Sequence, residues 1–279
     1  MTTESAQSVD SAGSEVKRPC VLVFAGADPS GGAGIQADIE AIASLGAHPM
    51  CVITALTVQD NDHVYSVHPV PALLIQQQAQ ALINKIEISA VKIGIVGSQE
   101  NAEAIAELIF ALKMNQPDLP VVLDPVLASG NGEALAADDA LQAIAALYGV
   151  TTLITPNLLE AAVLCGGDRR LEMQVESLLL VCQHALIKGG HASGDAVVNR
   201  WFTEGTSRTW SWPRLPGQFH GSGCTLASAI AALLANGQPM ADAIDLGQAY
   251  CQQTLDTSYA IALGQRIPNR ALSLLDEAS

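Results

Sequence analysis

Basic residues are scarce in this chain of 279 residues. Lys and Arg together number 13 against 28 Asp and Glu, which gives a formal net charge of -15 at pH 7. Nucleic acids and anionic membrane surfaces are bound by clustered Lys and Arg side chains, so this composition argues against both as partners. Any anionic ligand of this protein must therefore be held by a few local groups.

Cysteine is present, but not in a pattern that binds zinc or builds a disulfide framework. The cysteines are scattered, with no C-x-x-C pair and no histidine at zinc-ligand spacing. We therefore expect free thiols and a reducing cytoplasm. The six residues are Cys20, Cys51, Cys165, Cys182, Cys224 and Cys251.

Long apolar runs are absent as well. No run reaches the roughly 18 residues that a membrane span needs, and the first 17 residues lack the apolar centre of a signal peptide. Those residues are rich in Ser, Thr, Ala and acids, a composition typical of disorder. We predict a disordered tail over residues 1–18 and a single domain over residues 19–279, because 49% of the chain is hydrophobic and can build one large core.

What the chain does contain is a regular alternation of apolar strands and amphipathic helices. A strand at 20–26 precedes a helix in which Ile35, Ile39 and Ile42 share one face. This alternation is typical of βαβ units and predicts a three-layer α/β/α fold around a mostly parallel, doubly wound sheet. Further strands are predicted at 50–56, 64–70, 91–96, 121–126, 152–155, 185–188, 197–203 and 208–212, with helices at 71–86, 99–114, 138–148, 158–165 and 171–181.

The unusual polar and glycine-rich stretches of the chain follow the predicted strands directly. In sheets of this kind, ligands bind outside the carboxyl ends of the strands. We therefore predict that these stretches meet at one edge of the sheet and form a binding site there. They are residues 27–34, 57–62, 94–98, 124–132, 156–160 and 188–191.

A glycine-rich turn, H-G-S-G-C-T over residues 220–225, opens a further helix. Its apolar face continues at 226, 230, 233 and 234, and its end is expected near Asn236, with Gly237 in the left-handed conformation. The free N–H groups and positive dipole end of such a helix favour an anion. They also favour a thiolate, so we expect a lowered pKa for Cys224. The alternative is a buried cysteine beside an ordinary turn.

Neither common nucleotide-binding fingerprint is present. The loop at residues 26–34 is not G-x-G-x-x-G, and it lacks the lysine of a P-loop. Its glycines still allow the backbone to approach a ligand closely. Asp38, one turn into the following helix, either points a carboxylate back at that ligand or occupies a solvated helix position.

Four further residues at strand ends can carry phosphate chemistry, and each has an ordinary structural alternative. Glu160 can hold Mg²⁺, although Asn157 and Glu160 at this spacing also form an N-cap with its capping-box partner. Lys188 can reach a phosphate or simply end a strand, and Asp124 can assist a metal or cap a loop. An anion hole, two carboxylates, a lysine and a thiol in one cleft together suit phosphoryl transfer.

Seven short motifs follow one another along the chain, and their order identifies a protein family more specifically than any single motif does. The motifs are Ala25–Asp38, Thr54–Gln59, Val91–Gly94, Leu123–Val126, Thr155–Glu160, Lys188–His191 and His220–Thr225. This order resembles the hydroxymethylpyrimidine/phosphomethylpyrimidine kinases, which are ribokinase-like enzymes of thiamine biosynthesis. The resemblance covers about residues 20–265. It implies an ATP- and Mg²⁺-dependent homodimeric enzyme that phosphorylates hydroxymethylpyrimidine first and then the resulting monophosphate.

The resemblance also assigns roles to particular residues. A pyrimidine is implied against Gly26, Ala33, Asp38, Gln59 and Val126. Asp38 and Gln59 can pair with the edge of an aminopyrimidine. The anion hole for the transferred phosphoryl group is implied at Gly221, Ser222, Gly223 and Cys224. The remaining implied contacts are Glu160 and Asp124 to Mg²⁺, and Asn157 and Lys188 to the ATP phosphates.

Cys224 stands where ribokinase-like enzymes that phosphorylate sugars usually carry an aspartate base. Our hypothesis is that a thiol replaces the carboxylate because the second acceptor is itself a phosphate, which a carboxylate would repel. Pyridoxal kinase is the nearest alternative activity, since pyridoxal also offers a hydroxymethyl group on a flat heteroaromatic ring. A non-catalytic protein that binds a vitamin precursor is a further alternative.

Overall fold

The computed structural model describes residues 17–127, 140–190, 192 and 194–271. The predicted disordered tail lies outside these residues except for its last two, as do His191 and most of the predicted site stretch at 124–132. Among the described helices, none combines the length and the apolar character that crossing a bilayer demands.

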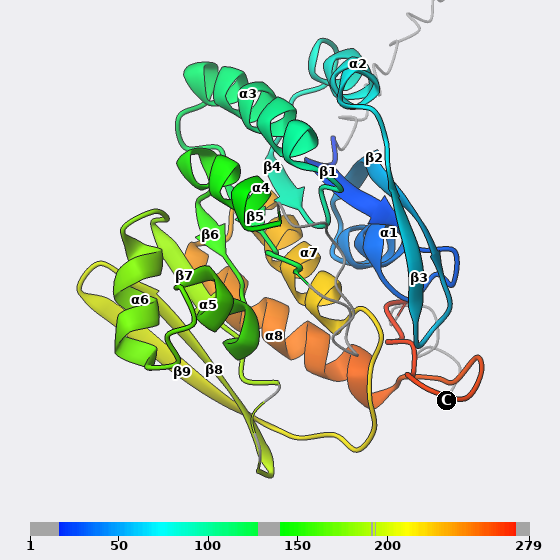
Figure 1. The fold of residues 1–279 in the computed structure, drawn as a ribbon, viewed down its shortest axis with the longest axis vertical. Helices are drawn as coiled ribbons and strands as arrows, with labels where there is room; N and C mark the ends of the chain where they lie inside the picture. Colours follow the sequence, from blue (N-terminus) through cyan, green and yellow to red (C-terminus); the bar gives the residue numbers. More distant parts are fainter. Residues whose placement is uncertain (1–16, 128–139, 191, 193, 272–279) are drawn as a thin grey trace, which may run out of the picture.

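The described residues form a nine-stranded sheet that runs through the centre of the molecule (Figure 1). Its strands are β1 (Cys20–Ala27), β2 (His48–Gln59), β3 (Val64–Pro69), β4 (Ala90–Ile93), β5 (Val121–Leu123), β6 (Leu153–Ile154), β7 (His184–Ile187), β8 (Ala196–Thr203) and β9 (Thr206–Pro213). The strand order is β3-β2-β1-β4-β5-β6-β7-β8-β9. Neighbours from β2 to β7 are parallel, whereas β3, β8 and β9 pair in antiparallel fashion at the two edges. The predicted mostly parallel, doubly wound sheet is confirmed.

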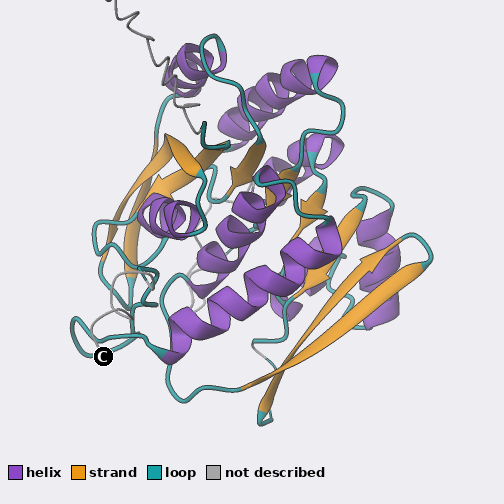
Figure 2. Cartoon of the chain, turned by 180° about the vertical axis from the view of Figure 1, so that it is seen from behind, coloured by secondary structure: helices purple, strands orange, loops and turns teal. Residues whose placement is uncertain are grey.

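Helices cover both faces of this sheet. They are α1 (Gly34–Ser44), α2 (Ala72–Ile83), α3 (Gln99–Asn115), α4 (Ala140–Leu147), α5 (Leu158–Leu164), α6 (Leu171–Leu179), α7 (Ser222–Ala235) and α8 (Met240–Asp256). Helices α2 to α6 lie on one face, and α1, α7 and α8 on the other, which Figure 2 shows from behind. Successive side chains of a strand point to opposite faces, so Leu22 and Phe24 pack in the first core and Val21 and Val23 in the second.

Several strands differ from their predicted lengths. β4 ends at Ile93 and β5 at Leu123, each shorter than expected. Asp124 N still donates to Ile93 O at 2.9 Å, but Pro125 has no N–H group, so the ladder stops there. β2 is longer than expected, because its polar end up to Gln59 pairs with β3 in a hairpin. Because β4 and β5 end early, the chain that follows them leaves the sheet, and its residues are available to form a binding site.

The strand order reverses between β1 and β4. From β1 the chain moves outward to β2 and β3, then returns to β4 and continues to the other edge. The loops that leave β1 and β4 diverge at this point and open a crevice beyond the carboxyl ends of the strands. A cavity of about 530 Å³ lies there, and its lining includes the residues at or just after the ends of β1, β4, β5, β6 and β7, namely Gly26, Ile95, Asp124, Asn157 and Lys188.

Candidate active site

One cavity brings together residues predicted from separate stretches of the sequence. Every predicted site residue except Asp38 lines it. The residues that do so are Gly26, Ala33, Gln59, Asp124, Val126, Asn157, Glu160, Lys188, Gly221, Ser222, Gly223 and Cys224. The predicted convergence at one edge of the sheet is confirmed for these residues, while the roles assigned to them stay predictions.

Helix α7 begins within the H-G-S-G-C-T stretch. Its N-cap residue, Gly221, adopts the left-handed conformation with φ of 77°, and a Cβ atom at this position would overlap the carbonyl oxygen of Gly32. The first turn of α7 is therefore in direct backbone contact with the loop after β1. Helix geometry leaves the N–H groups of Ser222, Gly223 and Cys224 without an acceptor inside the helix, and all three residues line the cavity. The turn has the donors that an anion hole requires.

Cys224 lies in this first turn as a free cysteine, and the residue as a whole is half-buried. Burial raises the pKa of Cys224, and the carboxylates of Asp38 and Asp124 add to the rise. Lys92 and a hydrogen bond from the Gly34 N–H oppose it without cancelling it. The expectation that the helix dipole lowers this pKa is wrong, because the cost of desolvating a thiolate exceeds the effect of the dipole. At neutral pH the thiol is protonated and uncharged.

Asp38 does not face the cavity, so its predicted contact with a pyrimidine is wrong in this geometry. The side chain is 0% exposed, and both of its carboxylate oxygens accept hydrogen bonds from Lys92 Nζ at 2.9 Å. Ser228 Oγ of α7 donates to Oδ1 at 2.6 Å. Burial alone would lower the pKa of Lys92, but Asp38, Cys224 and Asp124 together outweigh it and the pKa is raised. The pair joins α1, β4 and α7 beneath the Cys224 turn.

Asp38→Asn is expected to lower the free energy of unfolding by about 3–5 kcal/mol, because it leaves the Lys92 ammonium buried without a counter-charge. Urea unfolding measures this loss. Glu87→Gln removes the partner of an exposed lysine, Lys17, and serves as the matched control with almost no loss. A normally stable Asp38→Asn protein with weakened binding of hydroxymethylpyrimidine would instead support direct contact with the ligand.

Three charged side chains form a group at the ends of β5, β6 and β7. Lys188 Nζ donates to Asp124 Oδ1 at 2.7 Å. Glu160 Oε2 accepts from the Asn157 N–H at 2.7 Å, and Asn157 Oδ1 accepts from Glu160 N at 2.9 Å, so the capping-box alternative is present. Capping occupies one carboxylate oxygen of Glu160. In the described part of the chain Glu160 Oε1 and Asp124 Oδ2 have no hydrogen-bond donor.

This pair of carboxylates fits Mg²⁺. Burial raises the pKa of Glu160 to about 7, with Lys188 opposing and Asp124 reinforcing the rise, so a second cation here would relieve charge repulsion. No group of three or more His, Cys, Asp and Glu side chains suited to a metal occurs within the described ranges. Mg²⁺ does not need one, since one or two carboxylates commonly hold it together with waters and substrate phosphates.

Glu160→Gln is expected to stabilise the protein near pH 8 but not near pH 5. The folded state keeps the Glu160 proton up to a pKa of about 7, whereas the unfolded chain releases it near 4.5. The wild type therefore loses stability as the pH rises through this window, on the order of 3 kcal/mol, and a neutral amide does not. Urea unfolding at both pH values measures the difference.

Glu172→Gln is the control for this experiment, because Glu172 is an exposed acid in the first turn of α6. It should give the same stability change at both pH values. A pH-independent effect of Glu160→Gln would contradict the raised pKa.

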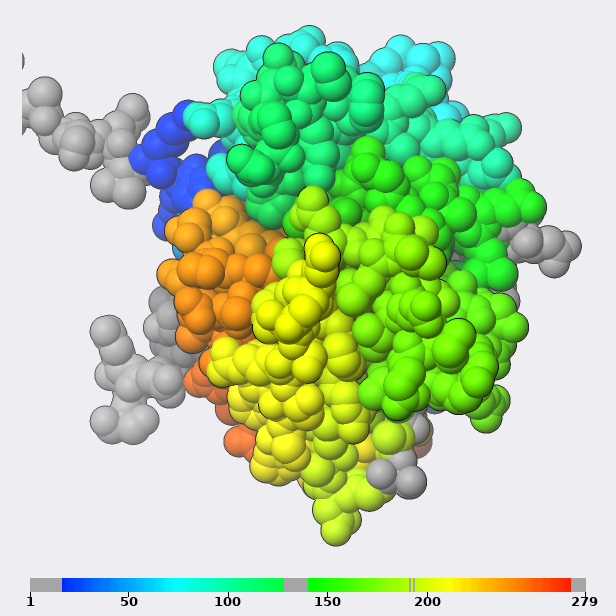
Figure 3. Space-filling view, turned by 90° about the vertical axis from the view of Figure 1, so that its left-hand side faces the viewer, coloured from blue at the N-terminus to red at the C-terminus, as the bar shows by residue number. Residues whose placement is uncertain are grey.

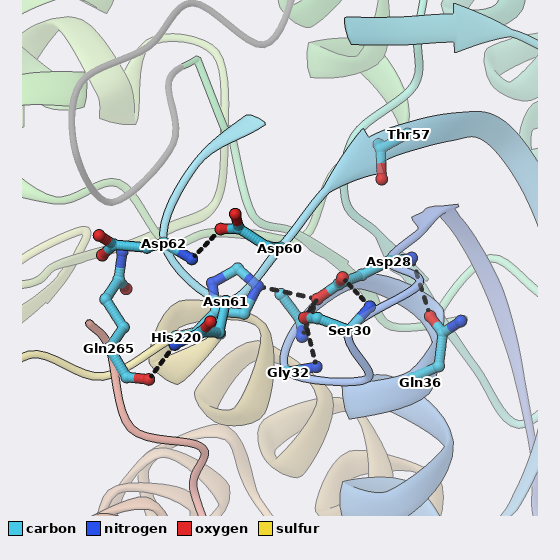
Figure 4. Close-up of polar contacts among 12 residues, drawn as sticks. Asp28, Ser30, Gly32, Gln36, Thr57, Asp60, Asn61, Asp62, His220 and Gln265 are labelled. Atoms are coloured by element: carbon cyan, nitrogen blue, oxygen red, sulfur yellow. Dashed lines mark hydrogen bonds and ion pairs between the residues drawn. The ribbon is translucent and has the colours of Figure 1, made fainter. Parts of the chain in front are cut away.

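The loop after β1 is tied to α7 by a pair that the sequence analysis did not single out. His220 Nε2 lies 2.8 Å from Asp28 Oδ2, and Figure 4 shows the two side chains pointing at each other. Asp28 also accepts from Ser30 N at 2.8 Å and Ala33 N at 2.7 Å. Burial would raise the pKa of Asp28, but His220 and the hydrogen bonds from Ser30 together outweigh it and the pKa is lowered. The two residues Asp28 and His220 are 192 positions apart, so no local pattern could have indicated this contact. The sequence indicated only that each residue lies in one of the seven motifs.

The mouth of the cavity is closed on one side by two segments that are distant in sequence. Asn61, in the turn between β2 and β3, donates to the carbonyls of Leu263 and Gln265, both at 3.0 Å (Figure 4). Asp62 and Gln265 line the cavity beside this contact. Nothing in the local sequence of either segment indicated the partnership.

The opposite end of the cavity is built from the β8–β9 hairpin and α8, which lie side by side in Figure 3, yellow and orange. Gln248 Oε1 accepts from Asn199 Nδ2 at 2.8 Å and from Trp212 Nε1 at 3.1 Å. Asn199 Oδ1 in turn accepts from Gly189 N at 2.9 Å. All three side chains line the cavity, and sequence reasoning missed them because strand and helix patterns alone do not show which polar residues meet.

The fold is that of the ribokinase-like α/β enzymes, because solved vitamin kinases share it over most of this chain. Residues 28–269 match the family model described as phosphomethylpyrimidine kinase. The chain belongs to the phosphomethylpyrimidine kinase family, and it is a kinase.

Individual relatives agree with this assignment. The hydroxymethylpyrimidine/phosphomethylpyrimidine kinase of Streptomyces coelicolor is 38% identical over 257 residues, which cover 89% of this chain and 93% of that protein. The crystal structure of phosphomethylpyrimidine kinase from Clostridium difficile 630 is similar with a TM-score of 0.72 and 32% identity, covering 86% of this chain and 100% of that one. Pyridoxal kinase from Staphylococcus aureus in complex with AMP-PCP and pyridoxal is similar with a TM-score of 0.80 and 26% identity, covering 91% of this chain and 94% of that one.

Proposed function

We propose that this kinase transfers a phosphoryl group from ATP to hydroxymethylpyrimidine and then a second one to the monophosphate, yielding the diphosphate used in thiamine biosynthesis. The observation that carries the proposal is the uncharged thiol of Cys224. It lies in the first turn of α7 within a cavity that Lys188, Asp124 and Glu160 also line. A neutral group at this position admits both a hydroxyl and a phosphate as acceptor.

The pyrimidine occupies the end of the cavity nearest β1 and β2 in this proposal. Gly26 and Ala33 provide backbone without bulky side chains there, and Val126 provides an apolar contact for a flat ring. Gln59 lines the same end and carries both an amide donor and a carbonyl acceptor, which suit the amino group and ring nitrogen of an aminopyrimidine.

The phosphates of ATP lie between Lys188 and the first turn of α7. Lys188 supplies positive charge, and the N–H groups of Ser222 and Gly223 point at the transferred phosphoryl group. Asp124 and Glu160 would hold Mg²⁺, which would neutralise negative charge on the phosphates during transfer. The nucleoside takes the remaining part of the cavity, along β8–β9 and α8.

We also propose that the enzyme works in the cytoplasm as a homodimer. All six of its cysteines are free thiols, which suits a reducing compartment. Leu56 and Val58, two positions apart on β2, are more than half exposed, which gives a second copy an apolar surface to cover.

Pyridoxal is the second candidate substrate, because the S. aureus pyridoxal kinase shares this fold over most of both chains. The test is kcat/KM for hydroxymethylpyrimidine and for pyridoxal in one ATP-consumption assay. We expect hydroxymethylpyrimidine to be clearly preferred. A preference for pyridoxal would replace the proposed substrate, and no turnover with either would favour a non-catalytic binding protein.

A further inference from the structure

Arg270 is the largest fully buried side chain of the described residues, and it lies outside every stretch that pointed to the site. Its side chain is 0% exposed, whereas that of its ion-pair partner Glu40, 3.2 Å away, is 48% exposed. This ion pair adds little to the stability of the fold, because the cost of desolvating the guanidinium offsets much of the attraction to a half-exposed carboxylate. Stability alone therefore does not explain why Arg270 is buried at this position.

The guanidinium reaches both glycine turns of the active site. Nη2 donates to the carbonyl of Gly32 at 2.5 Å, and Nε donates to Thr225 Oγ1 at 2.8 Å. Thr225 Oγ1 in turn donates to the carbonyl of Gly221 at 2.8 Å, and this oxygen also accepts the backbone N–H of Thr225 at 2.9 Å. One side chain therefore holds the carbonyl of Gly32 directly and that of Gly221 through a single hydroxyl.

The two peptide groups held in this way decide where the backbone donors point. In a trans peptide the carbonyl and the following N–H point in opposite directions. Fixing the Gly221 carbonyl toward Thr225 thus directs the Ser222 N–H out of the helix end, toward the cavity that Ser222 lines. The Gly32–Ala33 peptide is held at its other end as well, since Ala33 N donates to Asp28 at 2.7 Å.

The anchor of Arg270 is itself firm. Ser44 Oγ donates to its backbone carbonyl at 2.6 Å, and Tyr250 Oη donates to the same oxygen at 2.9 Å. Helices α1 and α8 therefore fix the backbone while the side chain extends to α7. The Asp28–His220 pair holds the catalytic turn from one side, and Arg270 with Thr225 holds it from the other.

We propose that Arg270, acting through Thr225, is a positioning residue for phosphoryl transfer. It holds the Gly32 and Gly221 carbonyls away from the phosphate and keeps the Ser222 N–H directed at it. This inference rests on the proposed kinase reaction, and it concerns residues that touch neither substrate.

The kinetic test compares Arg270→Met, Thr225→Val and Thr225→Ser. Displacing reacting groups by about 1 Å can cost about 100-fold in rate, so we expect Arg270→Met and Thr225→Val to lower kcat by about that factor. KM for hydroxymethylpyrimidine should change little. Thr225→Ser keeps the hydroxyl and should restore kcat, and the double variant should be no slower than Arg270→Met alone, because both act through one linkage.

Glu40→Gln is the matched control, since it removes the ion-pair partner without touching either glycine turn. It should keep wild-type kcat. The inference is overturned if Thr225→Val, measured as folded enzyme, turns over at the wild-type rate, or if Glu40→Gln and Arg270→Met lower kcat equally.

A second readout needs no turnover. Inorganic phosphate bound at the turn should slow the alkylation of Cys224 by iodoacetamide at alkaline pH, where a fraction of the thiol is ionised, and mass spectrometry of the Cys224 peptide follows the reaction. We expect protection in the wild type and in Thr225→Ser, and its loss in Thr225→Val. Equal protection in Thr225→Val would overturn the inference. A wild type that is protected by phosphate but phosphorylates no substrate would overturn the proposed function instead.

Discussion

Cys224→Asp is expected to abolish most of the second phosphorylation while leaving part of the first. The first acceptor is a neutral hydroxymethyl group, whereas the second is a phosphate that must lie close to the same side chain. Two unit charges about 4 Å apart repel by on the order of 4 kcal/mol at an effective dielectric constant near 20, which weakens binding about a thousandfold. The rates of the two steps, measured separately with hydroxymethylpyrimidine and its monophosphate, give the result.

The raised pKa of Cys224 supports this expectation, because it shows that the cavity favours the uncharged form of the side chain. Cys251→Ser is the matched control. Cys251 is a second thiol lining the same cavity, and its Sγ donates to the Ser222 carbonyl at 3.6 Å, a contact that serine can also make. It should leave the ratio of the two rates unchanged.

Equal losses in both steps for Cys224→Asp would contradict the explanation by charge repulsion. Cys224→Ala tests whether the thiol itself takes part in catalysis. A Cys224→Ala enzyme with undiminished turnover would show that the thiol has no catalytic role and that only the absence of a carboxylate matters.

Gly221→Ala is expected to lower kcat by about 100-fold. Alanine in the left-handed conformation costs roughly 1–2 kcal/mol, and its Cβ would overlap the Gly32 carbonyl, so the two turns of the active site must move apart. A displacement of about 1 Å between phosphate and donors is enough for a loss of this size. Steady-state kinetics with urea unfolding separates the rate effect from the stability effect.

Gly237→Ala is the control at the other end of the same helix. Gly237 adopts the predicted left-handed conformation with φ of 83°, and a Cβ atom there would meet nothing within 4 Å. This variant should lose similar stability from backbone strain and keep its kcat. If Gly221→Ala loses no more activity than Gly237→Ala, close contact between the two turns has no role in catalysis.

The mostly parallel character of the sheet and most of the residues that line the site were predictable from the sequence. Alternating strands and helices predict a parallel sheet, and in such a sheet the loops after the strands must converge at one edge. The polar loops after the strands were therefore sufficient to predict that Asp124, Glu160 and Lys188 lie in one cavity. Helix capping depends on residues that are close in sequence, so the Asn157–Glu160 capping box and the end of α7 could also be predicted from the sequence.

The network beneath the cavity could not be predicted. Lys92 meets Asp38 across 54 positions, and Arg270 meets Gly32 across 238. No local pattern reports such pairs. The position of Cys224 in a helix does not predict its pKa either, because that pKa depends on burial and on carboxylates that other elements bring close to the thiol. The errors about Asp38 and Cys224 have this common origin.

The most direct test of the central claim is a time course of products formed from hydroxymethylpyrimidine, ATP and Mg²⁺ by the wild-type enzyme. Phosphorus NMR distinguishes the monophosphate from the diphosphate. We predict that the monophosphate appears first and is then converted to the diphosphate, with two ATP consumed for each pyrimidine. Accumulation of the monophosphate alone, with no diphosphate at completion, would contradict a cavity built to accept both a hydroxyl and a phosphate.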